Sequence, residues 1–237
     1  LHGGCYRGRV AKVPIISVCD GTRRAGYALQ CAHHHGRSLM INVRTARMLA
    51  DYKNWADQRL FDSLAALPAG EVSKERVSVF KNMIGTLNHI YVVDRIWQSH
   101  LEGRGHGFKT SHDLVHPELA VLRLAQQDAD RWYCNWSTRQ TDASLDKPVR
   151  FTFVSGESGT MSAGAMLMHV VNHASYHRGW VVQMYFEIPA MPPVTDLPVY
   201  LRETQPTAFT SLHAPAAEPT CGVQFSNATS VLPDRYR

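Results

Sequence analysis

The middle of this 237-residue chain contains almost no cysteine. Four of the five cysteines lie in the two flanks: Cys5, Cys19, Cys31 and Cys221. Only Cys134 falls within residues 40–204, and a single cysteine cannot form an internal disulfide framework. The sequence therefore excludes a disulfide-stapled secreted domain and predicts a reducing, cytoplasmic setting.

Long apolar runs are also absent. No stretch reaches the roughly 18 consecutive apolar residues that a membrane-spanning helix requires. The N-terminal segment lacks the continuous apolar core of a secretory signal peptide. With 44% hydrophobic and 19% charged residues, the composition is that of a globular protein. We therefore expect no membrane partner.

Residues 40–204 carry no excess of positive charge. The net charge of +5 arises in residues 1–39, which hold six lysines and arginines against one aspartate. The segment 205–237 holds two basic and two acidic side chains. The segment 40–204 therefore holds 17 basic and 17 acidic side chains. A neutral domain does not support the electrostatic footprint of a nucleic-acid-binding protein. We expect no nucleic-acid partner, and DNA repair by direct contact is disfavoured.

The chain divides by composition into three parts. Residues 1–39 have no sustained helical period, no Trp and a run of three histidines. We interpret them as an extension before a natural start at Met40; a disordered arm native to the protein is the alternative. All five Trp lie in residues 40–204, the predicted folded domain. Residues 205–237 are rich in Ser, Thr, Ala and Pro and predict a disordered tail.

Four helical patterns occupy the predicted domain. Because apolar residues recur there at three- and four-residue spacing, we expect helices over residues 43–67, 74–101, 117–137 and 162–187. Between the last two, residues 149–161 alternate and then turn through two glycines, a pattern that predicts a small β-hairpin. Long helices with mostly short links predict an all-α fold. The expected architecture is an antiparallel four-helix bundle whose long third connection carries the hairpin.

The last predicted helix carries two histidines one turn apart. A step of four residues returns to within roughly 40° of the same direction, so His173 and His177 project from one face. Both imidazoles can reach a single ion at the usual Zn–N distance of about 2.0–2.1 Å. The glutamate of the HExxH zinc motif is absent between them, which excludes that class of metalloprotease. Hydrogen bonds to backbone or carboxylate groups would also satisfy two inward histidines, so the pair alone leaves both interpretations open.

His89 could supply a third imidazole. It lies in residues 87–93, which are apolar nearly all round the second predicted helix, and we therefore expect it to be buried. Alone, such a residue indicates a hydrogen-bonded core histidine. Helix bundles commonly build metal sites from side chains on facing helices, so His89, His173 and His177 form a candidate three-histidine site.

Four segments carry a resemblance to a known family. They read DYKNWA at 51–56, LNHIYVVDRIW at 87–97, HVVNHASYHRG at 169–179 and DLPVYLRE at 196–203. On these motifs the middle of the chain resembles the DinB/YfiT-like family. The resemblance implies that a divalent metal ion is held by His89, His173 and His177, and it implies no ligand role for His169. Trp180 is a departure, since the family often has Gln at that position.

Three neutral imidazoles would leave coordination positions open, as in catalytic rather than structural zinc sites. Such a site suits Zn, Ni or Fe, and it can activate water for hydrolysis or stabilise a thiolate for transfer. The resemblance implies enzymes that use low-molecular-weight thiols, and it implies homodimers. We therefore expect a metal-dependent enzyme, a thiol S-transferase or a hydrolase, that acts on a small molecule. A non-enzymatic, stress-linked metal- or ligand-binding bundle is the alternative.

Several polar residues near these motifs have alternative roles. Asp94 could orient a ligand histidine or pair with Arg95 or Arg178. Arg178 could bind an anionic substrate or form a salt bridge. Four histidines in and around the loop after the second helix are expected to be solvated or to form a lid over the site: His100, His106, His112 and His116.

Overall fold

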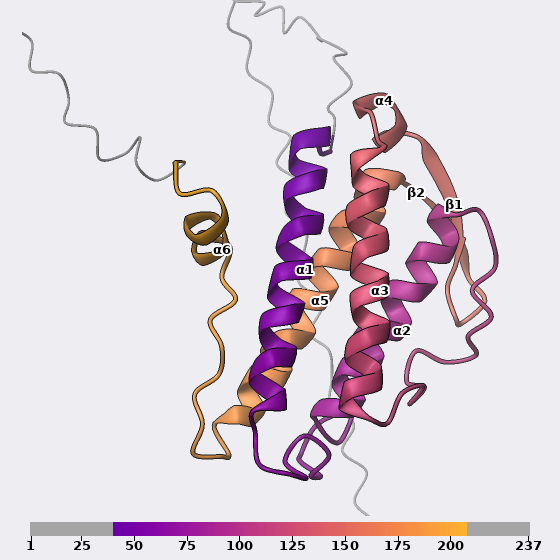
Figure 1. Cartoon of the computed structure of the whole chain (residues 1–237). Helices are drawn as coiled ribbons and strands as arrows, with labels where there is room; N and C mark the ends of the chain where they lie inside the picture. Colours follow the sequence, from indigo (N-terminus) through magenta and orange to yellow (C-terminus); the bar gives the residue numbers. More distant parts are fainter. Residues whose placement is uncertain (1–39, 208–237) are drawn as a thin grey trace, which may run out of the picture. The chain divides into compact units, whose positions relative to one another are not determined.

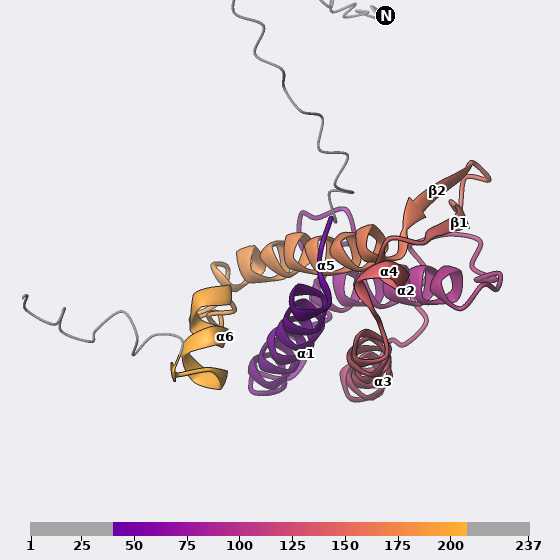
Figure 2. The same ribbon diagram turned by 90° about the horizontal axis from the view of Figure 1, so that it is seen from above.

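The structure is a computed structural model and describes residues 40–207. Four long helices dominate it: α1 (Val43–Ala65), α2 (Met83–Leu101), α3 (Leu119–Thr138) and α5 (Ala163–Tyr185). Figures 1 and 2 show α1 and α3 in one layer and α2 and α5 in the other. α1 packs against α3 and α5, and α2 packs against α5 and α3. The predicted all-α four-helix fold is confirmed.

The connection from α2 to α3 is a long loop. Residues 102–118 return along the bundle, so α2 and α3 start at the same end and run in the same direction (Figure 1). The direct neighbours α1 and α3 are antiparallel, as are α2 and α5. This loop contacts the histidines described below, and its course therefore matters for the site.

Side-chain caps start three of the long helices. The side chains of Asn42, Asn82 and Ser162 each accept a hydrogen bond from the backbone N–H three residues further on, at 2.9, 2.7 and 3.2 Å. Each cap satisfies one of the N–H donors that a helix leaves free at its start. Serine is a favoured N-cap residue, so the sequence predicts a cap at Ser162 where the last long helix starts, and this cap is confirmed.

α2 begins at Met83, although the apolar pattern predicted a helix from residue 74. Residues 71–82 form turns instead. The buried guanidinium of Arg76 donates to two backbone carbonyls of this segment at 2.7 and 3.0 Å. Lys81 adopts the left-handed backbone conformation, with φ of 67°. These local hydrogen bonds compete with the helix, and the prediction for residues 74–82 was wrong.

A two-stranded antiparallel hairpin joins α3 to α5. It consists of β1 (Pro148–Thr152) and β2 (Ser158–Ser162), with Phe151 opposite Gly159. A Cβ atom at Gly159 would lie 2.6 Å from the Phe151 ring, so this close approach requires glycine. β1 contacts α2, and β2 contacts α5. The predicted hairpin is confirmed.

Two apolar clusters fill the bundle, with polar residues between them. Along α1, Ala46 and Ala50 belong to one cluster, and Leu60 and Leu64 belong to the other. Lys53 lies between these pairs and is almost fully buried. The middle of the bundle is therefore polar, and both the histidines and a buried ionic cluster lie at this level.

The short helices were not predicted. They are α4 (Asp142–Leu145) and α6 (Leu197–Thr204), and α6 packs on α1. None of the helices within residues 40–207 combines the length and the hydropathy that a membrane crossing requires. The predicted extension over residues 1–39, and residues 208–237 of the predicted tail, lie outside the described residues.

Candidate metal centre

The three predicted histidines meet at one point. His89 extends from α2, and His173 and His177 extend from α5, so that one ring nitrogen of each lies within 4.8 Å of the others. His89 Nε2 and His173 Nε2 are 3.1 Å apart. Two nitrogens bound to one tetrahedral ion at about 2.0–2.1 Å would be roughly 3.3 Å apart. A hydrogen bond could explain this pair, but it would leave the third imidazole without a role.

A backbone carbonyl fixes the orientation of His89. Its Nδ1 lies 2.7 Å from the carbonyl oxygen of Ser111, in the loop between α2 and α3. Because a carbonyl oxygen only accepts, Nδ1 must carry the proton, and the lone pair is then on Nε2. Metal-bound histidines commonly donate their second ring nitrogen to a carbonyl in this way. The hydrogen bond therefore directs an unprotonated Nε2 toward the other two rings.

The other two imidazoles have buried nitrogens without partners. Nδ1 of His173 and Nδ1 of His177 find no hydrogen-bond partner among the described residues. Buried polar atoms are rarely left unsatisfied, because the lost hydration costs free energy. In His173 the unpartnered Nδ1 is not the atom that faces His89, which is Nε2, and a metal ion would use the three ring nitrogens that converge within 4.8 Å. The donor set therefore fits a divalent cation.

All three imidazoles are held neutral. Burial, followed by repulsion from His177 and His89, lowers the pKa of His173 to about 2. Burial, followed by His89, lowers the pKa of His177 to about 4. Burial also lowers the pKa of His89. A neutral imidazole has the lone pair that metal binding requires.

Aromatic side chains enclose the three histidines. The Phe80 ring stacks on His89 with 4.3 Å between centroids and meets the edge of His177 at 5.6 Å. Trp180 packs against His177 at 4.7 Å. Within the described residues no fourth Cys, His, Asp or Glu joins the group. The arrangement thus offers three ligands, apolar walls and no protein ligand for a fourth position.

The loop histidines do not act together. His112 stacks near His89, with ring centroids 5.7 Å apart, so part of the loop does cover the site. His100 and His106 instead pack against each other at 5.5 Å, beside the hairpin. His116 contacts Tyr91. A lid made of all four histidines is therefore wrong, whereas the segment at Ser111 and His112 does contact the candidate ligands.

Three further residues near the motifs have defined partners. His169 lies outside the three-histidine group and packs on Trp97, with ring centroids 4.7 Å apart. Arg178 donates to Asp57 at 2.7 Å, which is its predicted salt-bridge role. Asp94 pairs with Lys53 at 2.7 Å. Neither role expected for Asp94, orienting a ligand histidine or pairing with an arginine, is observed.

A second cluster of titratable side chains consists of three carboxylates. Asp57 from α1, Asp94 from α2 and Asp130 from α3 come together in the core. The ammonium group of Lys53 already lies 2.6–2.8 Å from all three. We assign this cluster a structural role, because the cation that the carboxylates require is supplied by the protein itself.

Sequence reasoning missed Phe80 and Ser111. Phe80 fell within a predicted helix, where its contact with the histidines could not be foreseen. Ser111 acts through its backbone carbonyl, so its side-chain identity carries no signal. For His89, the apolar setting indicated that a partner was needed, and the family resemblance implied that this partner is a metal ion.

Comparisons with known proteins agree with the motifs. Residues 40–208, more than half of the chain, match the model of the DinB family. Protein DinB of Bacillus subtilis is 29% identical over 168 residues, which are 66% of this chain and 94% of that protein. A DinB-like protein of Bacillus cereus, seen in a crystal structure, is 18% identical with a TM-score of 0.47. That match covers 61% of this chain and 91% of the other.

Proposed function

This chain belongs to the DinB family, and on that premise we propose that it is a metal-dependent enzyme acting on a small molecule. His89, His173 and His177 would hold one divalent ion. The observation that carries the proposal is the convergence of three neutral imidazoles, whose ring nitrogens lie within 4.8 Å of one another. Three imidazoles without a fourth protein ligand are typical of catalytic rather than structural sites.

A divalent ion at this position would lower the pKa of a coordinated water or thiol and so provide a nucleophile near neutral pH. The residues of the chain have supporting tasks. The Ser111 carbonyl keeps the proton of His89 on Nδ1 and away from the site. Phe80 and Trp180 limit the access of water to the imidazoles. Zn, Ni and Fe all suit such a donor set.

Two reaction classes follow from this arrangement. In thiol transfer, the sulfur of a low-molecular-weight thiol bonds to an electrophilic carbon, the leaving group departs with its electron pair, and the thiol proton passes to solvent. In hydrolysis, water takes the place of the thiol. We place thiol transfer first, because members of families similar to DinB are transferases that use low-molecular-weight thiols. A cytoplasmic setting and a homodimer stay predictions.

The test is turnover by the full chain after loading with zinc, nickel or iron(II). A panel of low-molecular-weight thiols would be combined with 1-chloro-2,4-dinitrobenzene and monobromobimane, and hydrolysis would be followed with p-nitrophenyl esters. We expect metal-dependent turnover that is lost in a His173→Ala/His177→Ala variant. Metal binding without turnover in either panel would contradict the enzyme proposal and favour a non-enzymatic metal-binding bundle.

A further inference from the structure

A cavity of about 370 Å³ lies directly beside the three-histidine site. His173, one of the three histidines, forms part of its wall, and Ser111, whose carbonyl holds His89, forms another part. α2 and the turn of the hairpin supply most of the remaining wall. The volume is within the range of small-molecule sites, roughly 300–1,000 Å³.

The walls of this cavity are largely apolar and aromatic. Val93, Ile96 and Trp97 line it from α2 and are themselves 5–7% exposed. Phe153 covers it from the hairpin turn, is 46% exposed, and meets the edge of Trp97 with centroids 6.2 Å apart. Such walls favour a flat apolar group that can pack against Trp97 and Phe153.

The charge of the lining is one-sided. Glu157 is the single formally charged residue of the cavity wall, and no Lys or Arg lines it. Within residues 40–207 the Glu157 carboxylate makes no salt bridge. The wall histidine His100 is neutral near pH 7, since burial lowers its pKa. While the three histidines hold no metal, an anion entering here would lose hydration without gaining a cation.

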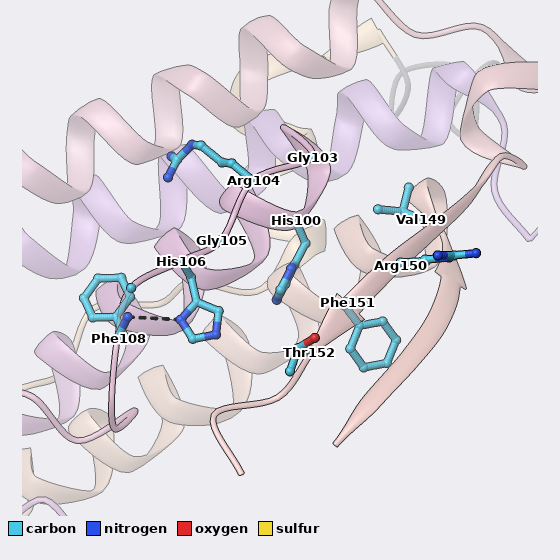
Figure 3. A pocket seen from close by; sticks show the side chains of 11 residues that line it. His100, Gly103, Arg104, Gly105, His106, Phe108, Val149, Arg150, Phe151 and Thr152 are labelled. Carbon is cyan, nitrogen blue, oxygen red and sulfur yellow. Dashed lines mark hydrogen bonds between the residues drawn. The ribbon is translucent and has the colours of Figure 1, made fainter. Parts of the chain in front are cut away.

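The larger cavity next to it is a poorer candidate. It has a volume of about 580 Å³ and shares His100 and Thr152 with the first. Figure 3 shows that its two arginines diverge, with Arg104 and Arg150 both directed away from His100. Arg104 is also already paired with Glu102. This cavity therefore lacks a convergent set of polar groups.

We propose that the wall of the cavity beside His173 favours an uncharged or cationic aromatic group over an anionic one when no metal is bound. The role of the cavity as the compartment for the electrophilic substrate rests on the proposed metal-dependent function. The binding of the aromatic group does not depend on that function, because the wall of the cavity is formed by the chain alone. Glu157 is one of the wall residues, and its carboxylate is the group with which an amine on the bound molecule would pair.

Three small probes with one ring and different charges test this inference on the metal-free chain: phenethylamine, 2-phenylethanol and phenylacetate. Binding would be followed by NMR through the Trp97 indole N–H signal, assigned with a Trp97→Phe variant. We expect phenethylamine to bind about two- to fivefold more tightly than 2-phenylethanol, the range of a solvent-exposed ion pair. Phenylacetate should bind at least about tenfold more weakly than the alcohol. Equal binding of all three, or preference for phenylacetate, would overturn the proposal.

Variants then locate the binding. Val93→Phe should fill the cavity and weaken the binding of every probe by about tenfold or more. Phe153→Ser should also weaken the binding of every probe, because it removes part of the aromatic wall without placing a larger side chain in the cavity. Glu157→Gln should remove the preference for the amine while leaving the alcohol unchanged. Glu75→Gln, at an exposed glutamate outside the cavity, is the matched control and should change neither. Unaltered binding in both Val93→Phe and Phe153→Ser would overturn the assignment.

The metal content of each variant, measured in parallel, separates this inference from the proposed function. If metal binds and no probe binds, the cavity proposal is wrong and the metal site is unaffected. If the probes bind and no metal binds, the cavity is a ligand site and its assignment as a substrate compartment is overturned.

Discussion

Replacing Lys53 by methionine should lower the free energy of unfolding by about 3–5 kcal/mol. The Lys53 ammonium lies 2.6–2.8 Å from the carboxylates of Asp57, Asp94 and Asp130, and all four side chains are buried. Methionine has a similar length but leaves three buried carboxyl groups without their shared cation. Asp57 keeps its ion pair with Arg178, but Asp94 and Asp130 must each take up a proton or remain charged in a medium of low polarity. Urea unfolding followed by circular dichroism would give the value.

The pKa values in this cluster reflect two opposing effects: burial disfavours every charge, and the attraction between Lys53 and the aspartates favours the charged forms. Burial opposes the charge on Lys53, but the three aspartates outweigh it and hold the pKa of the ammonium well above its usual range. Burial raises the pKa of Asp130 to about 7, against the opposing pull of Lys53. Burial also raises the pKa of Asp94. Without Lys53, Asp94 and Asp130 would lose the cation that favours their ionised forms.

Lys74→Met is the matched control for this substitution. The Lys74 side chain is 57% exposed and makes a long contact of 3.4 Å with Glu71, so its loss should change the stability by less than about 0.5 kcal/mol. A Lys53→Met/Asp130→Asn double variant should recover part of the lost stability, because one carboxyl group is removed with the cation. A Lys53→Met protein as stable as the parent would contradict the structural role of the cluster.

Metal binding should stabilise the folded chain strongly. The three histidines come from α2 and α5, so they are brought together only when the bundle is folded. A ligand at a hundredfold excess over its Kd adds about 2.7 kcal/mol to the free energy of unfolding. For a domain of this size we expect zinc to raise the Tm by roughly 5–10 °C. Differential scanning calorimetry with and without zinc would measure the shift.

The variants that check this stabilisation are single substitutions. His89→Ala, His173→Ala and His177→Ala should each abolish most of the shift, since each removes one of three ligands. His106→Ala is the control, because His106 lies at the larger cavity and outside the three-histidine group. A zinc-induced shift of the same size in His173→Ala and in the parent would show that zinc acts elsewhere on the chain.

Most of the long helices could be predicted from the sequence because each carries a clear apolar stripe. α1 begins at Val43 as expected, and α5 begins directly after the predicted Ser162 cap. The start of α2 could not be predicted, because buried Arg76 stabilises turns that a helical pattern does not reveal. Local hydrogen bonds from a side chain to the backbone decide such cases, and spacing alone does not encode them.

The sequence could predict the parts of the candidate site that follow from the pattern of a single helix. His173 and His177 share a face through their spacing, and His89 was singled out by its apolar surroundings. The buried position of Lys53 had no such signal, since a lysine on an amphipathic helix is normally exposed. Its partners come from three different helices, and only the tertiary fold brings them within reach.

The metal content of the purified chain tests the central claim most directly. The full chain would be produced without an affinity histidine tag, loaded with zinc, dialysed and measured by inductively coupled plasma mass spectrometry. A variant with alanine at His33, His34 and His35 would remove adventitious binding by that run. We predict about one equivalent of metal in the parent and in this variant, and none in His173→Ala/His177→Ala. No retained metal in the parent, or the same amount in the His173→Ala/His177→Ala variant, would contradict the account and leave the three histidines with a structural role.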